Sequence, residues 1–205
     1  MELTYSEAIY LFAELSVPDR SRLVNYDPHP SGQKISAKPL CHKMIMGALV
    51  YLVEKGYISL SIQNTKKLLF LPDKDIFAKR LKDGGSSLTG IEKILAANIE
   101  ENTKLNNAVY YLLRDDETSP WGMIVRISKD SLLQKGFLKM EEKRANIFSV
   151  KKHLYGEKDR ETAREVYEKA ENKIKEFTAQ NDMYRLSEKV IRKGVASRLE
   201  QSSDD

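Results

Sequence analysis

Two segments far apart in the chain share one pattern, in which a helix ends on a Lys-Gly pair and an extended segment then begins with an aromatic residue. Residues 52–58 read LVEKGYI, and residues 132–138 read LLQKGFL. Glycine is the residue that best adopts the left-handed conformation of a helix cap. In both places an apolar segment returns after a polar turn, which is typical of a β-hairpin. The chain is therefore predicted to carry two helix–β-hairpin units of the winged-helix type.

The first hairpin is predicted at residues 57–71 with its turn at 63–65, and the second at 137–151 with a charged turn at 141–144. Elsewhere, apolar residues recur three and four positions apart, which is the spacing of one buried helical face. This spacing is found in residues 3–15, and apolar residues line one side of 163–177. Further helices are predicted at 40–55, 89–101, 105–114, 123–135 and 186–199. Segment 40–55 is apolar on nearly every side, which predicts a buried central helix. The expected fold class is mainly α, a helical globular domain around the two hairpins.

Two helix starts show the spacing of a capping box, with a threonine followed three residues later by a glutamate. They are Thr4 with Glu7 and Thr89 with Glu92. In such a box each residue satisfies a backbone N–H group that the first helical turn leaves unpaired. Residues 28–32 hold too many helix and strand breakers for regular structure, so a loop is predicted there. Pro120 and Trp121 are expected in a second loop.

The most flexible stretch, residues 83–87 (DGGSS), is a candidate internal boundary. The expected organisation is one domain over residues 1–178, followed by a C-terminal helix and a frayed tail at 179–205. The longest strongly apolar run, 44–53, is about half as long as a membrane-spanning helix needs to be. We therefore expect a cytoplasmic protein, and association with the surface of a membrane stays open.

Residues with catalytic or metal-binding chemistry are sparse. Cys41 is the only cysteine, so an intramolecular disulfide is excluded. The three histidines, His29, His42 and His153, form no His-x-x-x-His pair. Cys41 and His42 are neighbours, and on a helix they point about 100° apart, which is unsuited to a shared metal. No catalytic residue, metal site or cofactor is predicted, and the expected class is a binding protein.

Basic residues are unevenly distributed although the net charge is only +4. Residues 28–53 contain no acidic side chain but hold Lys38, His42 and Lys43. A local excess of positive charge attracts phosphate, either of a lipid or of a nucleic acid. An ordinary solvated surface is the plain alternative.

A nucleic-acid-binding or regulatory protein of the winged-helix type is the second functional hypothesis. A reading helix needs exposed Arg, Lys, Asn or Gln side chains that reach base edges. The helix before the first hairpin is too apolar for this role. The helix before the second hairpin offers Arg126, Lys129 and Lys135.

The order of these features resembles the Golgi phosphoprotein 3 family of peripheral membrane adaptors. The resemblance covers roughly residues 3–177 and is carried by four segments: LTYSEAIYL at 3–11, GALVYLVEKGYI at 47–58, LLQKGFL at 132–138 and EKRANIF at 142–148. It implies a mainly helical fold with a protruding hairpin. It also implies binding of phosphatidylinositol 4-phosphate and of the tails of membrane proteins, and assembly into an oligomer.

The family's lipid site combines arginines with an aromatic residue, and this chain has other residues at those places: Ser36, Ile45, Gly122 and Val125. Nearby basic residues are the candidate lipid-binding set: Lys38, His42, Lys43, Arg126 and Lys129. In the second hairpin, Ile147 and Phe148 are the candidate contacts for oligomerisation. The expected partners are an anionic phospholipid head group, a protein tail and a second copy of the chain, with nucleic acid as the alternative.

Overall fold

A computed structural model of the chain describes residues 2–17, 26–66, 72–113, 119–145, 148–179 and 181–201. The helices are α1 (Tyr5–Leu11), α2 (Ala13–Ser16), α3 (Ala37–Glu54), α4 (Gly90–Ala97), α5 (Leu105–Leu112), α6 (Pro120–Gln134), α7 (Arg160–Ala179) and α8 (Asn181–Gln201), with a short 3₁₀ turn at Gly85–Ser87. The strands are β1 (Tyr26–Pro28), β2 (Lys34–Ser36), β3 (Ile58–Lys66), β4 (Pro72–Arg80), β5 (Thr103–Lys104), β6 (Leu138–Ala145) and β7 (Phe148–Tyr155). The predicted mainly α class is confirmed.

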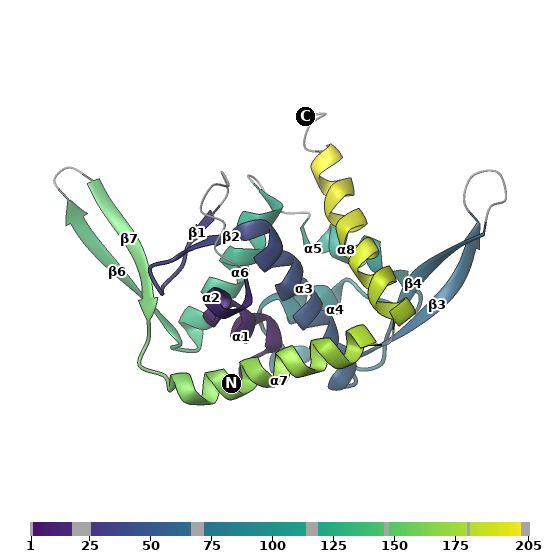
Figure 1. Cartoon of the computed structure of the whole chain (residues 1–205), viewed down its shortest axis with the longest axis horizontal. Coiled ribbons are helices and arrows are strands. Elements are labelled where there is room, and N and C mark those ends of the chain that lie inside the picture. Colours follow the sequence, from purple (N-terminus) through teal and green to yellow (C-terminus); the bar gives the residue numbers. More distant parts are fainter. Residues whose placement is uncertain are drawn as a thin grey trace.

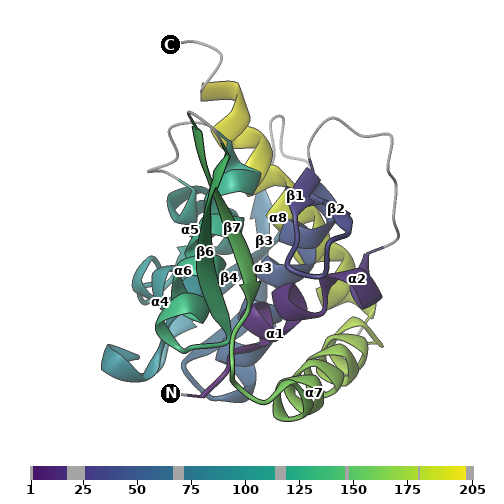
Figure 2. The ribbon, with the colours of Figure 1, turned by 90° about the vertical axis from the view of Figure 1, so that its left-hand side faces the viewer.

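The central helix is α3, as predicted. Its neighbours are α1, α4, α6, α7 and α8, and the two hairpins β3–β4 and β6–β7 project from opposite ends of the body (Figure 1). Turned by 90°, the ribbon shows α7 along the underside of the body, next to α1 (Figure 2). Among the described residues, none of the helices combines the length and the apolar composition needed to cross a membrane.

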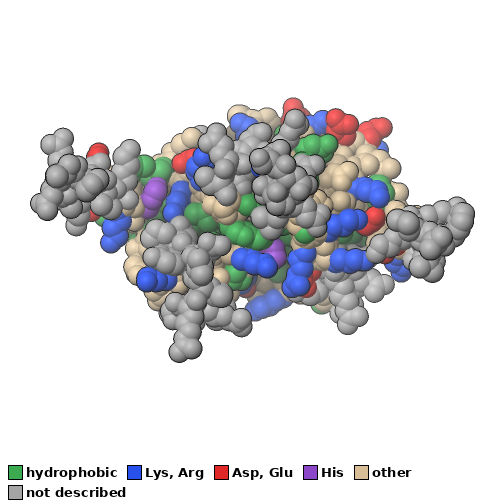
Figure 3. Space-filling model, turned by 90° about the horizontal axis from the view of Figure 1, so that it is seen from above, with side chains coloured by type: hydrophobic (Ala, Val, Ile, Leu, Met, Phe, Trp, Pro, Cys, Tyr) green, Lys and Arg blue, Asp and Glu red, His purple; other side chains and the backbone are tan. Residues whose placement is uncertain are grey.

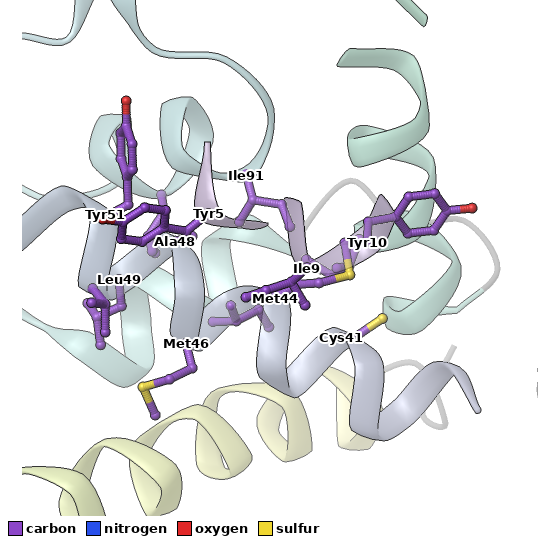
Figure 4. Close-up of a cluster of buried hydrophobic side chains, with 14 of the residues drawn as sticks. Tyr5, Ile9, Tyr10, Cys41, Met44, Met46, Ala48, Leu49, Tyr51 and Ile91 are labelled. Carbon is purple, nitrogen blue, oxygen red and sulfur yellow. The ribbon is translucent and has the colours of Figure 1, made fainter. Parts of the chain in front are cut away.

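The core lies where α1 crosses α3. Ile9 and Met44 are fully buried there, and the rings of Tyr5 and Tyr51 meet edge to face with their centroids 5.2 Å apart (Figure 4). Gly47 permits this close crossing, because a Cβ atom at its position would lie 2.5 Å from Cδ1 of Ile9.

Both predicted glycine caps are confirmed. Gly56 has φ +68° and Gly136 has φ +77°, in the left-handed region. At the end of α3 the N–H of Tyr57 donates to the carbonyl of Leu52 at 2.8 Å, and at the end of α6 the N–H of Phe137 donates to that of Leu132 at 3.0 Å. These six-to-one bonds define a Schellman motif, which turns the chain out of the helix into the hairpin.

Replacing Gly56 by alanine is expected to lower the free energy of unfolding by about 1 kcal/mol, because a Cβ atom disfavours a positive φ. No atom lies within 4 Å of that Cβ position, so the loss reports backbone conformation rather than a clash. Urea denaturation measures the effect. Lys55→Ala, one residue earlier at φ −78°, is the matched control with a smaller expected loss. Equal stability of Gly56→Ala and the wild type would contradict the cap assignment.

Both hairpins are longer than predicted. Residues 63–65, predicted as a turn, belong to β3, and residues 141–144 belong to β6. The predicted return strand at 68–71 lies outside the described residues. The charged segment of β6 is compatible with a strand because Glu141 faces Lys152 across the ladder. Opposite charges at facing positions stabilise an antiparallel pair.

Two predicted loops are also wrong in part. Tyr26 pairs with Ser36 and Pro28 with Lys34, so β1 and β2 form a short antiparallel ladder on either side of the predicted loop at 28–32. Pro28 ends its strand, a position that a residue without an N–H group tolerates. Pro120 is the first residue of α6 rather than a loop residue, and proline suits that position because its missing N–H would have no partner in the helix.

A buried ion pair joins α1 to the end of α6. Nζ of Lys135 lies 2.6 Å from Oε2 of Glu7, and the two side chains are 1% and 0% exposed. The same ammonium donates to the Glu2 carbonyl at 2.7 Å, and the Ser131 hydroxyl donates to Oε1 of Glu7 at 2.5 Å. Lys135, suggested above as a nucleic-acid contact, is thus unavailable on the surface.

A second buried carboxylate, that of Glu92, lies next to this pair. The N–H of Ser6 donates to it at 3.0 Å and the Ser6 hydroxyl at 2.7 Å, so Glu92 binds α1 and does not close the predicted capping box with Thr89. The Thr89 hydroxyl instead donates to Glu7 at 3.1 Å. The first predicted box is present, with the N–H of Thr4 donating to Glu7 at 2.8 Å. Burial and the nearby Glu7 carboxylate raise the pKa of Glu92 to about 7.

Candidate anion-binding face

Lys38 and His42 lie on the same side of α3, four residues apart in its first turns. Lys38 is exposed and His42 is half-buried. The imidazole of His42 meets the indole of Trp121 edge to face, with centroids 5.2 Å apart. Trp121 belongs to the first turn of α6, and its carbonyl accepts a hydrogen bond from Sγ of the buried Cys41 at 3.3 Å. The histidine therefore lies at the junction of α3 and α6.

Arg192 brings a further cation to this junction from α8, and sequence reasoning missed it. Burial lowers the pKa of His42 below its ordinary value, and the charges of Arg192 and Lys38 lower it further. The Glu188 carboxylate, which accepts a hydrogen bond from Arg192, opposes this shift. Both cations are exposed, and together with the half-buried His42 and the buried Trp121 that packs against it they form what we call the cationic face.

Three predicted site residues remain, Lys43 on α3 and Arg126 and Lys129 on α6. Lys43 points towards α7, where its Nζ lies 2.6 Å from Oε1 of Glu171, because successive residues of a helix are 100° apart. On α6, Arg126 is exposed and Nη2 lies 3.0 Å from Sδ of Met123. Lys129 is half-buried, with Nζ 5.9 Å from the centroid of the Tyr10 ring.

The predicted oligomerisation contacts are only partly described. Ile147 lies outside the described residues. Phe148 begins β7, where it pairs with Ala145.

Seen from above, several Lys and Arg side chains lie around a histidine and patches of apolar surface (Figure 3). Such a surface offers charge for a phosphate group and an apolar border for the part of a ligand that adjoins it. A guanidinium presents a planar fork of donors that matches phosphate oxygens, and Arg192 is the residue of the cationic face with this geometry.

No family model, no curated protein and no solved structure matches this chain significantly.

Proposed function

We propose that the chain is a non-catalytic peripheral membrane protein that binds anionic phospholipid head groups through the cationic face. The observation that carries the proposal is that two exposed cations, Lys38 of α3 and Arg192 of the adjoining α8, both act on the charge of His42, whose ring packs against the indole of Trp121. The proposal agrees with the resemblance to the Golgi phosphoprotein 3 family. Arg192 would supply the guanidinium that α3 itself lacks.

The expected affinity is modest and depends on salt. A lysine or arginine near an anionic membrane surface contributes about 1 kcal/mol, and this attraction decays within a Debye length. Glu188 offsets part of the charge of Arg192, so multiple head groups or a second binding event are needed for stable attachment. An acidic protein tail is the other ligand that this face would attract.

The test is co-sedimentation with phosphatidylcholine vesicles that contain phosphatidylinositol 4-phosphate, at low salt. The double variant Lys38→Ala/Arg192→Ala is expected to bind more than about tenfold more weakly, because it loses two contributions of about 1 kcal/mol. The matched control is Lys43→Ala/Lys169→Ala, which changes the net charge equally. These lysines pair with Glu171 at 2.6 Å and Glu54 at 2.8 Å on the side of α7. Equal losses in both double variants, or no binding by the wild type, would contradict the proposal.

A winged-helix nucleic-acid binder is the second candidate, and the order of elements favours it. The succession α4, β5, α5, α6 and the hairpin β6–β7 follows the order that the winged-helix hypothesis expects, and α6 would be the reading helix. Against it, β5 pairs with β4 rather than with the wing, and the exposed side of α6 carries Asp130 beside Arg126. A gel shift that is abolished by Arg126→Ala and unchanged by Lys38→Ala/Arg192→Ala would favour this candidate.

A further inference from the structure

A pocket of about 180 Å³ lies between the end of β4, the glycine-containing loop and α4. It is lined by the charged residues Arg80, Asp83 and Lys93 and by small or apolar residues of the loop and of α4. The loop is anchored to Tyr57, just beyond the end of α3, whereas Lys38 lies at the start of that helix. An 18-residue helix is about 27 Å long, so this pocket and the cationic face are at opposite ends of α3.

Hydrogen bonds hold the segments that form the walls of this pocket in place. The N–H of Leu81 donates to the Tyr57 carbonyl at 2.8 Å, and the Tyr57 hydroxyl lies 2.9 Å from that of Ser87. On the other wall, the N–H of Arg80 donates to the Glu100 carbonyl at 3.0 Å. A pocket that is already formed loses little conformational entropy when a ligand binds.

Both glycines suit the shape of the loop. A Cβ atom at Gly84 would lie 2.2 Å from Cδ1 of Leu88, the side chain that forms part of the pocket floor. Gly85 has φ +44°, which disfavours any residue with a side chain. The sequence DGGSS, predicted to be the most flexible stretch, contributes one wall of the pocket.

The charge of the pocket is positive. Arg80 and Lys93 are both exposed, and within the described part of the chain neither side chain forms an ion pair. Asp83 is the one acidic lining residue, and its carboxylate accepts the N–H of Gly85 at 3.4 Å. Two cations against one carboxylate leave a net charge of +1. The floor, formed by Leu88, Ala96 and Ala97, is apolar.

We propose that this pocket binds a small soluble phosphate monoester. Its phosphate would lie between the Arg80 guanidinium and the Lys93 ammonium, and its organic part would lie on the apolar floor. An arginine fork and a lysine point charge together suit a dianionic phosphate better than a singly charged carboxylate. If the cationic face holds the protein on a membrane, this pocket lies at the other end of α3 from that contact, which favours a soluble ligand over a lipid head group.

The experiment is a titration of the ¹⁵N-labelled full chain with phenyl phosphate, followed by two-dimensional NMR at constant ionic strength. We expect saturable shifts of the amides of the 83–88 loop with a Kd in the millimolar range, and weaker binding of inorganic phosphate, which lacks the apolar part. Arg80→Ala and Lys93→Ala are each expected to raise the Kd about tenfold, because each removes a charge-assisted contact. Lys79→Ala, the neighbouring residue on β4, is the matched control and should leave the Kd unchanged.

Shifts that do not saturate, or equal losses in Lys79→Ala and Arg80→Ala, would overturn the proposal. A lipid ligand is tested separately with vesicles that contain phosphatidic acid. Vesicle binding that depends on Arg80 and Lys93, without loop shifts from phenyl phosphate, would also overturn it. The face variant Lys38→Ala/Arg192→Ala should retain the loop shifts, so the failure of one site is distinguishable from the failure of the other.

Discussion

Replacement of Lys135 by methionine is expected to lower the free energy of unfolding by about 3–5 kcal/mol, because it leaves the Glu7 carboxylate buried without its cation. Both side chains are almost completely inaccessible to solvent, so water cannot substitute for the lost ammonium. The hydrogen bond to the Glu2 carbonyl is lost as well. Urea denaturation at pH 7 measures the change, and a loss below about 1 kcal/mol would contradict the role of this pair.

Two further variants separate charge from packing. Lys55→Met removes an exposed ion pair, in which Nζ lies 2.9 Å from Oε1 of Glu2, and is expected to cost less than about 0.5 kcal/mol. The double variant Glu7→Gln/Lys135→Met contains no unpaired carboxylate at this position and should recover part of the stability lost in Lys135→Met. If it is no more stable than the single variant, the loss comes from packing rather than from the buried charge.

The second large effect is a pH dependence that originates at Glu92. Its pKa is about 7 in the folded chain, raised from 4.5 by burial and by Glu7. The folded state therefore holds the proton more tightly than the unfolded state. The contribution of Glu92 to stability is complete below pH 4.5 and is lost as the pH rises through 7.

The variant Glu92→Gln has no proton to lose, so its stability relative to the wild type is expected to increase with pH. Between pH 4.5 and pH 8 the gain should be roughly 3 kcal/mol, the free energy of the raised pKa. Glu100→Gln, at an exposed carboxyl, is the control and should differ from the wild type by less than about 0.5 kcal/mol throughout. A difference between Glu92→Gln and the wild type that does not vary with pH would contradict the assignment.

Local sequence was sufficient for the positions of the hairpins but not for their lengths. Gly56 and Gly136 are recognisable because the requirement for a positive φ is a property of one residue in a short segment. The strands extend further because oppositely charged residues, such as Glu141 and Lys152, occupy facing positions in the ladder. That pairing depends on register, which a turn predicted from composition does not define.

The candidate site was predictable only where its residues share one helix. Lys38 and His42 are four residues apart on α3, but Arg192 reaches them through the packing of α8 against α3. One missed signal was local. On α6, Ser128, Leu132 and Lys135 recur at the spacing of a buried face, which would have placed Lys135 inside rather than on a reading surface.

The length of α3 determines the rotation of the hairpin β3–β4, which follows this helix, relative to β2, which precedes it. Its 18 residues, at 100° each, make five complete turns, so the chain enters and leaves the helix at the same azimuth. Inserting a single residue would rotate the hairpin β3–β4 by about 100° relative to β2 and α1. A change in the length of α3 therefore preserves the orientation of this hairpin only in steps that restore the angular phase of the helix.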